Sequence, residues 1–340
     1  MLGSELQPIT APSVASSPTS EQPKKKNKRK RKTRLKNQDQ QQQQTKKHDE
    51  PNEWADKCMY AELLEMNSDD PWTTTDGLPD DLETGWVAVA PVPVGKRCLA
   101  ISHNSNGTAP NTMLRSRALG KPLMARFPSS LPPNTVVDCI LDCNWRDNGI
   151  LHVLDVVKWK GQDIGDCETA FRFWWRDTRL AELPISPPPA LTSPRHQSDH
   201  APSRYRFSYP TTLLPIPYYQ NTSLDSLSAV VLPLARSSRS VTVDVPVLAP
   251  ADISMDIDGA AEGPSIDHLP INVYPDGMLL YVSEASYDSG TSPLSSWVPI
   301  KPFTPVPSLN AEAPLDKFQR LVHQRMERKT AAVSIEVEMS

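Results

Sequence analysis

Long apolar runs and aromatic residues are the scarcest features of this 340-residue chain. Only 6% of the residues are aromatic, although eight of them are tryptophan. No stretch approaches the roughly 18 consecutive apolar residues that a membrane-spanning helix needs. The N-terminus is rich in Ser, Pro and Gln and lacks the apolar segment of a signal peptide. We therefore expect no membrane association and a reducing compartment.

Cysteine is also sparse, and its pattern excludes two further classes of site. The five cysteines are Cys58, Cys98, Cys139, Cys143 and Cys167. An odd number without a secretory signal argues against a disulfide framework. Cys139 and Cys143 lack the histidine or second cysteine pair that a zinc site requires. We expect buried thiols, no bound metal and no cofactor.

Acidic residues are missing from one short, strongly basic segment. Residues 24–36 carry ten lysines and arginines and no acid, and this +10 leaves −14 for the rest of a chain whose formal net charge is −4. A solvated surface would mix positive and negative side chains. A compact basic segment attached to an acidic body therefore indicates a partner that binds this segment.

The 35 prolines argue against two fully ordered domains. Low-complexity composition over 1–52 predicts a disordered N-terminal arm that buries no core. We expect one folded domain over 53–310, with low-order insertions at about 184–203 and 234–263, and a C-terminal helix and tail over 311–340.

The hydrophobic pattern predicts an α+β fold, mainly of antiparallel sheets, with few helices. Residues at helical spacing favour an amphipathic helix over 53–66, and further helices are expected at 223–231 and 315–329. The expected strands lie at 86–90, 98–101, 136–141, 151–159, 170–175, within 271–282 and at 297–303. Asn148-Gly149 and Lys160-Gly161 predict turns between strands.

Several spaced motifs together resemble one known domain. The segments are Gly85–Ile101, Arg126–Pro132, Ile140–Cys143, Val153–Gly161, Asp166–Trp175, Asp276–Tyr281 and Ser292–Trp297. Their order and spacing resemble the cap-binding domain of snurportins, adaptors that carry trimethylguanosine-capped spliceosomal ribonucleoprotein particles into the nucleus. The resemblance implies binding of capped small nuclear RNA and a fold similar to the nucleotide-binding domain of messenger RNA guanylyltransferases.

The resemblance also bears on catalysis at Lys96. Guanylyltransferases and DNA ligases carry a nucleophilic Lys-x-Asp-Gly motif here, whereas Lys96 is followed by Arg97, Cys98 and Leu99. The groups that would activate the lysine and position a metal are missing. We therefore expect that the protein is not an enzyme. A divergent capping-type nucleotidyltransferase is the alternative, and a basic RNA-binding scaffold a third class. Lys96 and Arg97 either contact cap phosphates or form a solvated pair.

The family's stacking tryptophan is matched by Trp297, for which core packing is the alternative. A guanine methylated at N7 carries a delocalised positive charge, so stacking on indole gains roughly 1–3 kcal/mol. In the lead-in before the first strand, Leu63 stands where a second tryptophan is usual, and Tyr60 and Ala61 fall at neighbouring cap-contact positions. Core packing is the favoured alternative for Leu63, and either Tyr60 or Trp54 could replace the second aromatic contact.

A basic residue between 112 and 121 is implied to contact the cap phosphates. Arg117 is the nearest match, with Arg115 and Lys121 as alternatives. The alternative for all three residues is a solvated basic loop that contacts no ligand.

The basic segment resembles a nuclear localisation signal rather than the family's extended importin-binding helix. Its matching residues are Lys24, Lys25, Lys26, Lys28, Arg29, Lys30, Arg31 and Lys32. The family implies an importin-β-type receptor, reached directly or through importin-α, an exportin for recycling, and shuttling between nucleus and cytoplasm. Nonspecific RNA contact is the competing interpretation. Selectivity for trimethyl over monomethyl caps stays open.

Overall fold

The computed structural model describes residues 52–66, 76–104, 110–189, 205–246, 266–302 and 312–338. The predicted arm apart from Asn52, its basic cluster and most of the two predicted insertions lie outside these ranges. Among the helices that are described, none is long and apolar enough to cross a membrane.

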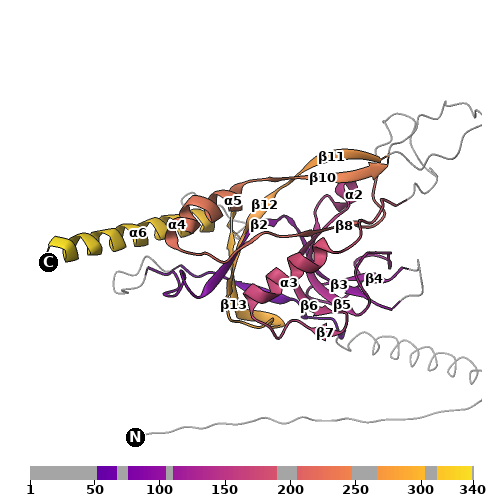
Figure 1. Cartoon of the computed structure of the whole chain (residues 1–340), viewed down its shortest axis with the longest axis horizontal. Coiled ribbons are helices and arrows are strands. Elements are labelled where there is room, and N and C mark those ends of the chain that lie inside the picture. Colours follow the sequence, from indigo (N-terminus) through magenta and orange to yellow (C-terminus); the bar gives the residue numbers. More distant parts are fainter. Residues whose placement is uncertain are drawn as a thin grey trace, which may run out of the picture. The chain divides into compact units, whose positions relative to one another are not determined.

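Two sheets form the body of the fold (Figure 1). The five-stranded sheet has the order β1 (Met59–Leu63), β13 (Gly290–Pro299), β12 (Pro275–Val282), β2 (Trp86–Pro93) and β9 (Tyr218–Tyr219). The six-stranded sheet has the order β4 (Thr112–Ser116), β3 (Gly95–Ser102), β5 (Thr135–Asp142), β6 (Ile150–Trp159) and β7 (Gln162–Asp163), with β8 (Thr212–Pro215) beside β6. Among the strands that the structure describes, only β1–β13 and β6–β8 pair in parallel, so the predicted α+β fold with mainly antiparallel sheets is confirmed.

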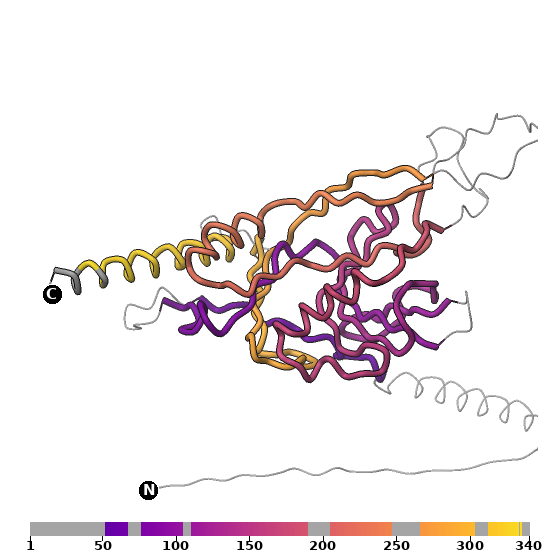
Figure 2. The backbone as a smooth tube through the Cα atoms, in the orientation of Figure 1, coloured from indigo at the N-terminus to yellow at the C-terminus, as the bar shows by residue number. Residues whose placement is uncertain are grey.

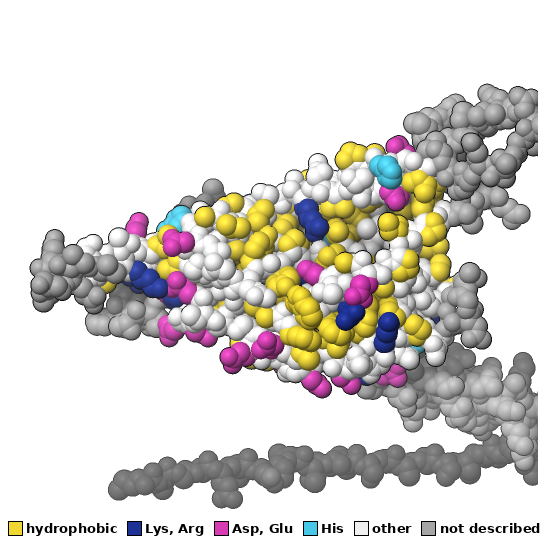
Figure 3. All heavy atoms as spheres, in the orientation of Figure 1, with side chains coloured by type: hydrophobic (Ala, Val, Ile, Leu, Met, Phe, Trp, Pro, Cys, Tyr) yellow, Lys and Arg dark blue, Asp and Glu magenta, His cyan; other side chains and the backbone are white. Residues whose placement is uncertain are grey.

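The helices are α2 (Trp145–Asn148), α3 (Thr169–Ala181), a continuous run of α4 (Leu224–Ser226), the π-helical turn η1 (Leu227–Val231) and α5 (Leu232–Arg236), and α6 (Pro314–Glu338). The predicted helices at 223–231 and 315–329 are therefore confirmed. Figure 3 shows apolar side chains around α3, where Trp174 is 50% exposed.

The chain passes from one sheet to the other at a single residue. β2 pairs with β12 and β9, whereas β3 pairs with β4 and β5. Only Val94 separates these two strands. The sheets therefore diverge from this point instead of joining through an ordinary hairpin.

The side chains of β2 pack into two different cores, because successive side chains of a strand point to opposite faces. Val87 and Val89 join Ile140, Leu154 and other residues in a core between the sheets. Ala88 and Ala90 face a second core, which is closed by apolar residues of the α4–α5 run and of α6. The helices thus cover the outer face of the five-stranded sheet.

The predicted helix over 53–66 is wrong. The segment holds a turn followed by β1, whose Met59 is 1% exposed. β1 pairs in parallel with β13, more than 200 positions away, with one register shift between Ala61 and Glu62, and this long-range pairing overrides the local helical spacing.

The predicted strand over 170–175 is also wrong, because this segment begins α3. Arg172 and Arg176, four residues apart, are both buried. Arg172 donates hydrogen bonds to both carboxylate oxygens of Asp155 at 3.1 and 3.2 Å, and Arg176 donates to the carbonyl oxygen of Ile216 at 2.7 Å. Arginines occupy the buried positions of this helix. A search for hydrophobic periodicity treats arginine as a surface residue and therefore misses the helix.

Part of the predicted insertion at 234–263 is regular structure. β10 (Arg239–Pro246) pairs with β11 (Ile266–Val273) along its whole length, and the two run side by side as one ribbon in Figure 2. Val241, Val243 and Val245 alternate with polar residues, and Val243 is buried. This period-2 pattern is typical of a half-buried strand.

The other predicted boundaries are confirmed with shifts. The segment 271–282 is a strand–turn–strand, and the last strand begins at Gly290 and ends at Pro299 rather than spanning 297–303. Lys160 and Gly161 adopt φ values of 52° and 86° in a two-residue turn between β6 and β7. At Asn148-Gly149 the connection is longer, because α2 precedes Gly149.

Candidate functional site

A cavity of about 460 Å³ opens where the two sheets diverge. It is lined by residues of β1, β2, β3, β12 and β13 together with single residues from β5 and from the loop after β4. The lining residues are Tyr60, Ala61, Leu63, Val92, Pro93, Gly95, Arg97, Arg117, Ile140, Asp276, Leu279, Thr291 and Trp297.

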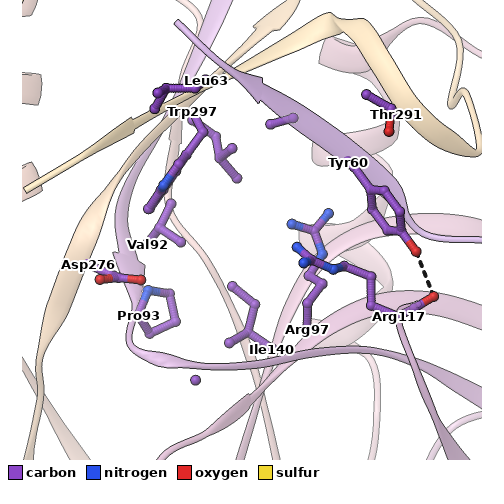
Figure 4. A pocket seen from close by; sticks show the side chains of 13 residues that line it. Tyr60, Leu63, Val92, Pro93, Arg97, Arg117, Ile140, Asp276, Thr291 and Trp297 are labelled. Carbon is purple, nitrogen blue, oxygen red and sulfur yellow. Dashed lines mark hydrogen bonds between the residues drawn. The ribbon is translucent and has the colours of Figure 1, made fainter. Parts of the chain in front are cut away.

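The structure brings six of the seven predicted ligand-site residues into this one cavity. They are Tyr60, Ala61, Leu63, Arg97, Arg117 and Trp297 (Figure 4). Lys96 does not line it. Lys96 is exposed and lies between Gly95 and Arg97 on β3, and neighbouring side chains of a strand point to opposite faces.

Trp297 and Leu63 form the apolar wall. The indole extends from β13 towards β12, where a Cβ added to Gly277 would lie 2.9 Å from Trp297 Cη2. Only a glycine leaves room for the ring at this position. Leu63 lies beside Trp297 at the rim and is 50% exposed, so core packing, the favoured alternative for Leu63, is not what the structure has.

Arg97 occupies the opposite wall and is held rigidly. Its Nε and Nη2 donate to the two carboxylate oxygens of Asp138 at 2.6 and 2.8 Å, and Nη2 also donates to the carbonyl oxygen of Met59 at 3.1 Å. Burial alone would lower the pKa of Arg97, but the adjacent Asp138 carboxylate raises it. Arg97 is therefore a fixed cation whose charge is largely balanced by Asp138.

Arg117 lies beside Arg97 and is held differently. Its guanidinium lies over the Tyr60 ring, 4.8 Å from the ring centroid. The Tyr60 hydroxyl donates to the carbonyl oxygen of Arg117 at 2.7 Å and lies 2.9 Å from Asp56 Oδ1. Arg117 is exposed, so its charge is accessible to an anion entering the cavity.

Of the alternatives predicted for the basic and aromatic contacts, Arg117 and Tyr60 line the cavity. Arg115 donates to the carbonyl oxygen of Gly120 at 3.2 Å, and neither it nor Lys121 lines the cavity. Trp54 packs against a small cluster that contains Leu99 and Ile101. Tyr60, not Trp54, is therefore the aromatic side chain that lines the cavity beside Arg117.

Sequence reasoning missed Asp276, which places a carboxylate at the cavity rim. Partial burial raises the pKa of this carboxyl group, against the lowering effect of Lys301. The sequence signal was the Asp276-Gly277 dipeptide at the start of the matched segment Asp276–Tyr281, to which no ligand contact was assigned. Within the described ranges no three His, Cys, Asp or Glu side chains gather into a metal site.

Fold and cavity define an α+β ligand-binding domain with one aromatic wall and one cationic wall. Residues 71–188 match the family model of the Snurportin1 m3G cap-binding domain. This match supports a snurportin-type protein. The matched segment runs from before β2 to beyond α3 and supplies six of the lining residues: Val92, Pro93, Gly95, Arg97, Arg117 and Ile140.

Proposed function

We propose that this protein binds the trimethylguanosine cap of small nuclear RNA in the cavity described above. The observation that carries the proposal is the placement of the Trp297 indole opposite Arg97 and Arg117 in one cavity. A cap joins a flat cationic base to a chain of phosphates, and these walls offer a complementary surface to each part. The volume of about 460 Å³ lies within the usual range for small-molecule sites.

The base is expected to stack on Trp297. An N7-methylated guanine gains dispersion and cation–π attraction from an indole face, of order 1–3 kcal/mol. Leu63 and Val92 add apolar surface beside the indole, where the N2 methyl groups would lose contact with water.

The phosphates are expected at the Arg97 and Arg117 wall. Guanidinium groups form charge-assisted, often bidentate hydrogen bonds to phosphate oxygens. Arg117 supplies the accessible charge, while Arg97, fixed by Asp138, supplies a preorganised donor.

We further propose that binding is not followed by catalysis. The fold is inferred to be related to the nucleotide-binding domain of guanylyltransferases, in which a lysine attacks a nucleotide phosphate. Here Lys96 lies outside the cavity lining, and the residues after it lack the Asp and Gly of the nucleophile motif.

The biological role we propose is nuclear import of capped ribonucleoprotein particles. Support comes from the snurportin-type domain and from the basic cluster at 24–36, which suits an importin-β-type receptor engaged directly or through importin-α. Such an adaptor shuttles between cytoplasm and nucleus and is recycled by an exportin.

The decisive experiment titrates the full chain with trimethylated, monomethylated and unmethylated cap dinucleotides and follows tryptophan fluorescence. We expect saturable quenching with the trimethylated cap and clearly weaker binding of the unmethylated one. Absence of saturable binding, or equal affinity for all three ligands, would refute the proposal.

A further inference from the structure

The cavity has an uneven distribution of charge. Arg97 and Arg117 lie together on one side, whereas Asp276 is the only carboxylate among the lining residues. Figure 4 shows the Asp276 side chain on the side of Trp297 and Val92, away from the two arginines. The cavity is thus negative beside its aromatic wall and positive at the opposite wall.

Backbone geometry places residue 276 beside the indole of Trp297. Asp276 precedes Gly277, the residue over which the tip of Trp297 lies at 2.9 Å from an added Cβ. The carbonyl oxygen of Asp276 accepts a hydrogen bond from the Ile300 amide at 2.9 Å, which ties this end of β12 to the end of β13. The backbone that carries the Asp276 side chain is therefore anchored beside the tip of the indole, and the carboxylate lies on the side of the cavity where a base would stack.

Asp276 differs from the other acids near the site. Asp138 is bonded to Arg97 and Tyr287, and Asp56 lies against the Tyr60 hydroxyl. The Asp276 carboxylate makes no hydrogen bond to any part of the chain that the structure describes, and the charge that lowers its pKa is that of the exposed Lys301. Its charge is available to a ligand.

We propose that Asp276 is a specificity-determining residue that favours a positively charged, N7-methylated base over a neutral guanine. Methylation at N7 places a delocalised positive charge on the ring, and a carboxylate beside the stacked ring attracts that charge. Stacking on Trp297 supplies affinity to both bases, while Asp276 supplies part of the difference between them. This inference rests on the proposed function and names the residue that selects the charge of the ligand.

The test compares two cap dinucleotides that both carry the two N2 methyl groups and differ only in the N7 methyl group. Their affinities are measured for the wild-type chain and for Asp276→Asn. Because the carboxylate lies at a solvated rim, we expect an effect of about five- to tenfold. Asp276→Asn should weaken binding of the N7-methylated ligand by this factor and leave the neutral ligand within twofold.

Two further variants make the test specific. Asp276→Glu keeps the charge and should retain most of the discrimination. Glu284→Gln removes the same charge from an exposed residue outside the cavity lining and should leave both affinities unchanged. A thermal melt of each variant checks that the fold is intact.

Each outcome decides between the hypotheses. Equal weakening of both ligands in Asp276→Asn, or no weakening of either, would overturn the inference and leave the proposed function standing. An unfolded Asp276→Asn together with a folded Asp276→Glu that binds both ligands equally would also overturn it. Failure of the wild-type chain to bind the N7-methylated ligand would overturn both the inference and the proposed function.

Discussion

Leu63 of β1 lies directly opposite Trp297 of β13, and the next amide, that of Leu64, donates to the carbonyl oxygen of Trp297 at 3.1 Å. The two residues are far apart in the sequence, yet this parallel pairing makes them one continuous apolar wall. Leu63 is half exposed, whereas Trp297 is partly buried against the core between the sheets, so changing Leu63 should alter the binding of a ligand more than the stability of the fold.

Replacing the indole gives the most direct test of this wall. Trp297→Ala should weaken cap binding by about ten- to a hundredfold, because roughly 1–3 kcal/mol of stacking is lost, while the domain stays folded. The matched control is Trp174→Ala, which removes a half-exposed indole from α3. Isothermal titration measures both. Unchanged affinity in Trp297→Ala would contradict the site.

Gly277→Ala should weaken ligand binding and also destabilise the domain. The added Cβ would meet Trp297 Cη2 at 2.9 Å and would also collide with the carbonyl oxygen of Val298. We expect a loss of about 2 kcal/mol or more, measured by urea unfolding, and a displaced indole.

Gly161→Ala is the control for that substitution. Gly161 has φ of 86° and no atom within 4 Å of an added Cβ, so only backbone strain of about 1–2 kcal/mol is expected. A Gly277→Ala variant that bound and unfolded like Gly161→Ala would show that the close approach of the indole is unimportant.

The contact between α6 and the segment before β2 should weaken in acid. Arg325 donates from Nε to Asp76 Oδ2 at 2.7 Å and from Nη2 to Asp76 Oδ1. These bonds lower the pKa of Asp76 below its ordinary value of 3.8. A lowered folded-state pKa means that the stabilisation is complete above about pH 4 and is lost as the pH falls through the folded value.

Asp76→Asn should therefore reduce the free energy of unfolding at pH 7, by about 2 kcal/mol for a hydrogen-bonded charge. The difference from wild type should shrink below about pH 4. Chemical unfolding at several pH values measures it, with Glu312→Gln as an exposed-pair control of little effect. A difference that stayed constant down to pH 3 would contradict this assignment.

No covalent nucleotide adduct should form on Lys96. The side chain is exposed and lies outside the cavity lining. Incubation with radiolabelled GTP or ATP and a divalent metal, followed by denaturing gel electrophoresis, measures adduct formation. An acid-labile adduct mapped to Lys96 would favour the nucleotidyltransferase alternative.

Deleting residues 24–36 should abolish nuclear accumulation while leaving cap affinity within about twofold. The deletion removes ten positive charges and no residue of the cavity, and independent sites contribute additively. Binding to the import receptor should weaken with salt, because exposed charges are screened beyond about 8–10 Å. A tenfold loss of cap affinity would instead support direct contact between this segment and RNA.

The sequence predicts the sheets well where apolar residues alternate or run continuously, as in Val87–Val89 and Val136–Leu141. It fails where long-range contacts decide the structure. Arg172 and Arg176 give α3 its buried face through bonds to β6 and its neighbours, and β1 exists because β13 lies beside it. No local pattern contains that information.

The same limit applies to the site. Trp297 and Arg117 could be named from a resemblance of spaced motifs, and both line the cavity. Lys96 was named with Arg97 because spacing alone does not tell which face of a strand meets the ligand. Asp276 was missed because the resemblance matched Asp276–Tyr281 as a segment of the fold and gave the acid no contact with the ligand.

The order of the walls along the chain has a consequence for biosynthesis. Tyr60 and Leu63 come early, Arg97 and Arg117 follow, and Asp276 and Trp297 are made near the end. A ribosome that has translated only the first 188 residues holds the cationic wall and the lead-in strand but not the aromatic wall. Under the proposed function, we expect that the nascent chain binds a cap only after β12 and β13 have emerged and folded onto β1 and β2.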